Sequence, residues 1–204
     1  MSSRSLVRWT VTAVPAIAVA GMMLTACSST SIQKEQSSTS QDNAHSSTSA
    51  SQPATASQSP SNTGPVGTTY KVTGTDSNGN STAYSVTLNK ILSPAAPDNE
   101  FDAASSGKHL VGAEFTIKGI SGTSSDDANS DAAVQGNDKQ LYQPSFSGIA
   151  AGTNFNNGDF NVAPGVTEIG WVAFEVPNSV TVASVQWNPS GGFGGGTATW
   201  TAGS

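Results

Sequence analysis

The sequence of 204 residues has little reactive chemistry: one cysteine, two histidines and 11% charged residues. A single cysteine excludes an intrachain disulfide, so packing alone must stabilise the folded part. The chain has no Gly-x-Ser-x-Gly turn, and no His-x-x-x-His or cysteine pair to hold zinc. These absences argue against the common hydrolase and zinc chemistries. The sequence therefore predicts a protein that is not an enzyme.

Basic residues are also scarce and never clustered. Without Arg4 and Arg8 of the leader, six lysines oppose 14 aspartates and glutamates, which gives a net charge of about −8. Nucleic acid binding depends on clustered Lys or Arg that neutralise phosphates. The composition therefore excludes nucleic acid as a partner.

The first 26 residues have the pattern of an export signal. Two arginines precede the apolar stretch Val11–Leu24, which contains a proline and is too short to span a bilayer comfortably. The following Leu24, Thr25, Ala26 and Cys27 resemble the lipobox of bacterial lipoproteins. That resemblance implies cleavage before Cys27, a diacylglycerol on its sulfur, and a location on the outer face of the cell membrane within the envelope.

Residues 27–66 differ abruptly in composition from the leader. Ser and Thr fill about half of the positions, and large apolar residues are almost absent, so the segment cannot offset its ordering entropy by burial. We expect a disordered tether of about 40 residues behind the lipidated Cys27, which lifts the following domain away from the membrane.

Residues 67–204 are long enough for one domain with its own core. Apolar residues alternate with polar ones, as in Leu110–Lys118, and Gly, Asn, Asp, Ser and Pro punctuate short segments. The run Gly170–Val176 is apolar on both faces and is expected near the middle of a sheet. About eight strands predict an all-β, immunoglobulin-like two-sheet β-sandwich, with a jelly roll as the open alternative.

Four segments carry a resemblance to a known family. They are Gly107–Phe115, Phe155–Gly158, Ala163–Gly165 and Gly170–Pro177. Together they resemble a family of bacterial lipoprotein domains of unknown function, similar in fold to secreted immunoglobulin-like mycobacterial antigens. The resemblance covers about residues 71–200 and implies a fold but no catalytic residues.

The candidate ligating residues lie in one acidic segment, residues 126–131. Asp127, Asn129 and Asp131 have the alternate-residue spacing with which calcium loops collect oxygens. The match is incomplete, because the sixth loop position is Ala132 and the twelfth is Asp138. A calcium site and a solvated loop both remain open here, and no other cofactor is expected.

Aromatic residues are the candidates for ligand contact. Trp187 and Trp200 share strand faces with small apolar residues and are expected in the core. Trp171, Phe155 and Tyr142 are less clearly assigned and could contact a ligand. We therefore expect a membrane-anchored recognition or adhesion module for a protein or a glycan. The alternative is a structural or accessory subunit of an envelope complex, and the oligomeric state is left open.

Overall fold

The computed structural model describes residues 31–35, 62–155 and 157–203. Leu24, Thr25, Ala26 and Cys27 lie outside the described residues, so the leader and the lipid anchor stay predictions. Within the described residues, thirteen strands are joined by only three short helical turns. No helix in this part of the chain is long and apolar enough to cross a membrane.

The larger sheet has six strands. Their order is β1 (Ser31–Lys34), β3 (Thr69–Thr75), β4 (Ser81–Ala95), β5 (Lys108–Ser121), β11 (Thr167–Pro177) and β9 (Pro144–Ser145), and every neighbouring pair is antiparallel. The alternation predicted for Leu110–Lys118 is confirmed in β5. Val111, Ala113, Phe115 and Ile117 are fully buried on the inner face, because successive strand residues point to opposite faces.

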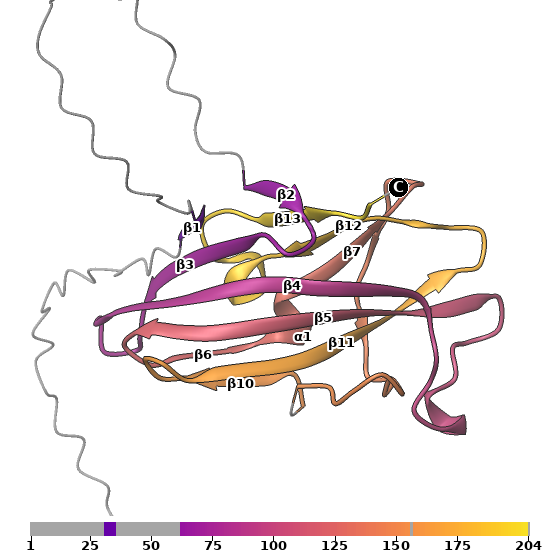
Figure 1. Cartoon of the computed structure of the whole chain (residues 1–204), viewed down its shortest axis with the longest axis horizontal. Coiled ribbons are helices and arrows are strands. Elements are labelled where there is room, and N and C mark those ends of the chain that lie inside the picture. The colour runs from indigo at the N-terminus through magenta and orange to yellow at the C-terminus, as the bar shows by residue number, and fades with distance from the viewer. Residues whose placement is uncertain (1–30, 36–61, 156, 204) are drawn as a thin grey trace, which may run out of the picture.

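The facing sheet has five strands in the order β2 (Thr63–Pro65), β13 (Ala198–Thr201), β12 (Val182–Trp187), β7 (Ala132–Gly136) and β8 (Leu141–Tyr142). A separate pair, β6 (Ser124–Asp127) and β10 (Asp159–Val162), lies beside β5 and β11 (Figure 1). The helical turns are η1 (Glu100–Asp102), α1 (Ala128–Asp131) and η2 (Pro189–Gly192).

Aromatic side chains fill the space between the two sheets. Trp187 and Trp200 are fully buried, and each ring packs against Phe115, with centroids 5.0 and 5.9 Å away. The Trp200 indole donates to the carbonyl of Thr68, and the Trp187 indole donates to the hydroxyl of Tyr84. The predicted all-β sandwich is confirmed, and so is the core position of both tryptophans.

The prediction of a tether over residues 27–66 is wrong at two places. Ser31–Lys34 forms β1, which pairs with β3, and the domain begins at β2 rather than at residue 67. Ile32 is buried, its carbonyl accepts from the Asn62 side chain, and the Ser31 and Thr73 hydroxyls are 2.7 Å apart. The free edge of β3 supplies the hydrogen bonds that a Ser-rich segment cannot supply to itself.

The apolar segment Gly170–Val176 is not in the middle of a sheet. Its strand, β11, pairs with β5 along its whole length. Among the described residues, its other edge pairs with Pro144 and Ser145 and, through an isolated bridge at Trp171, with Asn154. The outer face of β11 is apolar because a long connection covers it. Ile149 of this connection packs over Trp171 and forms a second, smaller core with Ala173 and Leu110. Both faces of β11 are therefore covered, although only one of its two edges has a full neighbouring strand.

Candidate functional site

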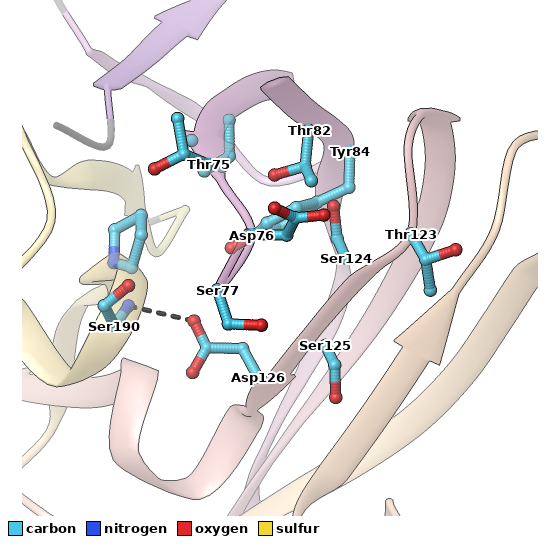
Figure 2. A pocket seen from close by; sticks show the side chains of 13 residues that line it. Thr75, Asp76, Ser77, Thr82, Tyr84, Thr123, Ser124, Ser125, Asp126 and Ser190 are labelled. Carbon is cyan, nitrogen blue, oxygen red and sulfur yellow. Dashed lines mark hydrogen bonds between the residues drawn. The ribbon is translucent and has the colours of Figure 1, made fainter. Parts of the chain in front are cut away.

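A polar pocket lies at one end of the sandwich, where three distant segments meet. It is a cavity of about 340 Å³ between the β3–β4 turn, the start of β6 and η2 (Figure 2). Its lining is Val72, Gly74, Thr75, Asp76, Ser77, Thr82, Tyr84, Thr123, Ser124, Ser125, Asp126, Pro189 and Ser190. Hydroxyl groups and two carboxylates dominate this wall, and it contains no Lys or Arg.

Asp76 supplies one of the two carboxylates and also organises the β3–β4 turn. Its Oδ1 accepts from the backbone N–H groups of Asn78 and Asn80, and its Oδ2 accepts from the Asn80 side chain. These hydrogen bonds, those from Asn80 first, lower the pKa of Asp76 below its ordinary value. The pocket therefore keeps a negative charge at its rim at neutral pH.

Asp126 supplies the second carboxylate and ties β6 to η2. One oxygen accepts from the backbone N–H of Asp127, and the other from the backbone N–H of Ser190, both at 3.0 Å. Ser190 has a φ of 59°, a left-handed conformation that a non-glycine residue rarely adopts. The charged acceptor therefore holds a strained turn in place at the pocket wall.

Asp131 lies behind this wall and is fully buried. Its Oδ1 accepts from the backbone N–H of Gly191 at 2.8 Å, whereas its Oδ2 has no hydrogen-bond partner among the residues that the structure describes. Burial, followed by the charge of Asp126, raises the pKa of Asp131 to about 8. With this raised pKa, Asp131 is protonated at neutral pH.

The acidic segment with the calcium-loop spacing is partly helical. Residues 128–131 make one turn of helix, so Asp127 caps that turn by accepting from the Asn129 N–H instead of facing a shared ion. Asp127 and Asn129 line a separate hollow of about 220 Å³, while Asp131 points into the interior. Asp127 and Asn129 therefore lie at one hollow, and the buried Asp131 does not join them. Within the described residues, no three acidic, His or Cys side chains are grouped to hold a metal.

The three aromatic candidates differ in exposure. The structure contradicts the prediction for Trp171 and Phe155, which are only 2% and 7% exposed. Trp171 lies under Ile149, and Phe155 packs on Gly170. Tyr142 is half-buried on the edge strand β8, and its hydroxyl donates to Asp138 at 2.6 Å. Tyr142 alone of the three keeps part of its ring accessible.

The glutamate and histidine side chains on β5 and β11 that could serve in acid and base chemistry are dispersed. Glu114 pairs with Lys90 at 3.6 Å, and Glu175 pairs with Lys108 at 3.1 Å. The two glutamates are four residues apart along paired strands, or about 13 Å, beyond the separations that glycoside hydrolysis uses. The ring nitrogen Nε2 of His109 lies 3.2 Å from the Ser93 hydroxyl, away from the polar pocket.

Known proteins that resemble this chain do not indicate its function. No family model matches the chain, and no curated protein matches it. A solved structure of a functionally unknown protein from Listeria monocytogenes EGD-e is 16% identical, with a TM-score of 0.33. The match covers 57% of this chain and 64% of that chain. The resemblance to the lipoprotein domain family therefore stays a prediction, and the fold and pocket define the chain only as a β-sandwich with an acidic end pocket.

Proposed function

We propose that this chain is an envelope lipoprotein, anchored at Cys27, whose sandwich serves as a recognition module through the acidic end pocket. The observation that carries the proposal is the composition of the pocket wall, in which Asp76 and Asp126 lie among eight hydroxyl-bearing residues. A structural subunit has no need for a concave surface of this composition. The proposal is a binding role without a catalytic step.

The chemistry of the wall indicates the class of ligand. Carboxylates favour a positive charge, and Ser and Thr hydroxyls both donate to and accept from the hydroxyls of a sugar. Thr75, Ser77 and Ser125 are exposed on the open side of the pocket. A glycan that carries a free amino group satisfies both requirements, and we propose that class over a protein ligand.

Glucosamine and N-acetylglucosamine test the pocket as a matched pair, because the acetyl group removes the charge and leaves the ring. We expect glucosamine to bind more tightly in a calorimetric or NMR titration. Asp126→Asn keeps an oxygen for the Ser190 N–H and removes the charge, so the affinity for glucosamine should fall about tenfold, or about 1.4 kcal/mol.

The control variant is Asp159→Asn, which removes an exposed carboxylate on β10 outside the pocket lining. It should bind glucosamine as the wild type does. Equal affinities for the two sugars, or equal losses in Asp126→Asn and Asp159→Asn, would contradict the proposed role of the pocket.

A further inference from the structure

The connection between η2 and β13 presents an isolated apolar side chain. Phe193 is 94% exposed, and it lies within the run Ser190–Thr197, which contains five glycines and no charged residue. Phe101 and Phe146 are each 90% exposed, but Phe101 lies in η1, which follows the end of β4 that is opposite the β3–β4 turn. Only the location of Phe193 relative to β1 distinguishes it from these two.

Phe193 lies close to the start of the described chain. Gly195, two residues later, forms a parallel bridge with Ser31, the first residue of β1. Ser31 also pairs with Thr73, and the adjoining Gly74 and Thr75 line the acidic pocket. The beginning of β1, the Phe193 loop and the pocket therefore share one end of the sandwich.

The anchor of the proposed function is only four residues before Ser31. Four residues span at most about 14 Å even when fully extended. Because β1 is part of the sheet, the 34 residues between Cys27 and Asn62 do not set the reach of the domain. A lipid on Cys27 would hold this end of the sandwich within about 14 Å of the bilayer surface.

We propose that the end of the sandwich that carries Phe193 docks on the lipid bilayer, with the Phe193 ring inserted at the interface. The inference rests on the proposed anchor at Cys27. An uncharged, glycine-rich loop can enter the interface without removing a charge from water, and an aromatic ring gains free energy there. The pocket opens at the same end, so its ligand would be reached at the membrane surface. Asp76 and Asp126 would make docking weaker on anionic than on zwitterionic lipid.

Phe193→Trp and Phe101→Trp form a matched pair of reporters. The chain that begins at Cys27 is coupled through this residue, its one thiol, to maleimide lipid in phosphatidylcholine vesicles that contain brominated acyl chains. Bromine quenches only those indoles that reach the hydrocarbon, and the wild type supplies the background of the native tryptophans. We expect at least twofold stronger quenching for Phe193→Trp than for Phe101→Trp. Equal quenching, or none for Phe193→Trp, would overturn the docking.

Ile32→Asp tests the limited reach. A charged side chain at this buried position should detach β1, and a Ser-rich chain of 34 residues has an end-to-end distance of roughly 30–35 Å. Neutron reflectometry on a supported bilayer should place the wild-type domain at the headgroups and the variant about 20 Å farther out. A wide water gap in the wild type would overturn the inference.

Coupling through maleimide imposes the anchor whether or not cells attach a lipid to Cys27. Failure of the docking test is therefore distinguishable from failure of the proposed function. If Ile32→Asp loses its cooperative unfolding transition, the comparison of Phe193→Trp with Phe101→Trp still decides between docking and its absence.

Discussion

Trp187→Ala should lower the free energy of unfolding by about 3–5 kcal/mol, which is a large fraction of the stability of a domain of this size. Trp187 is fully buried, and its ring packs against Phe115 and Phe160, with centroids 5.0 and 6.0 Å away. The truncation leaves a cavity and removes the indole that donates to the buried Tyr84 hydroxyl at 3.2 Å. Guanidinium chloride unfolding at neutral pH measures the loss.

Trp187→Phe is the matched control, because it keeps an aromatic ring in the same space and removes the indole N–H. The cost should fall to about 1–3 kcal/mol, mainly the penalty of the buried hydroxyl that loses its donor. A loss below 1 kcal/mol in Trp187→Ala would contradict the position of Trp187 at the centre of the sandwich.

Asp131 should make the domain less stable as the pH rises from about 4 to about 8. The pKa of Asp131 is raised to about 8 in the folded protein, whereas an unfolded aspartate has a pKa of about 3.9. The folded state holds the extra proton in this window, so the stability that Asp131 contributes is complete below pH 4. Between pH 4 and pH 8, this contribution to the free energy of unfolding falls by about 1.4 kcal/mol per pH unit.

Asp131→Asn should remove this dependence, because an amide accepts from the Gly191 N–H and does not titrate. The groups near Asp131 are Asp126 and Asp127 on its own segment and Tyr84 from β4, whose own pKa is raised well above its ordinary value by burial. The variant should gain several kcal/mol relative to the wild type between pH 4 and pH 8. Asp159→Asn controls for the change in net charge. Parallel stability profiles for Asp131→Asn and the wild type would contradict the raised pKa.

The sandwich could be predicted from the sequence because its strands alternate locally. In Leu110–Lys118 each inward residue is apolar, and this pattern is sufficient to assign the face. The same reasoning placed Trp187 and Trp200 in the core. It failed for Trp171, because the segment that covers it, around Ile149, has no periodicity of its own.

Long-range contacts explain what the sequence could not indicate. Ser31–Lys34 has one apolar residue among polar ones, and it forms a strand only because the edge of β3 lies beside it. The pocket likewise combines Asp76, Asp126 and Ser190, which come from three segments that only the topology brings together. The acidic segment 126–131 was singled out for its spacing. Its oxygens instead hold the backbone of η2 and the start of α1.

The location of β1 shortens the distance over which the domain could move away from an anchor at Cys27. A tether of about 40 residues would let the domain sample a wide shell above the membrane. With β1 docked in the larger sheet, the chain from Cys27 to the first strand is only four residues long. A lipid on Cys27 would therefore orient the domain, with its acidic pocket at the end nearest the bilayer.

The intact mass of the protein recovered from the membrane fraction tests the lipid anchor at Cys27. The account predicts a chain that begins at Cys27 and carries the added mass of a diacylglyceryl group, whereas Cys27→Ala carries no added mass. Wild-type protein that is recovered from membranes without this added mass, or with its first residue elsewhere, would contradict the account.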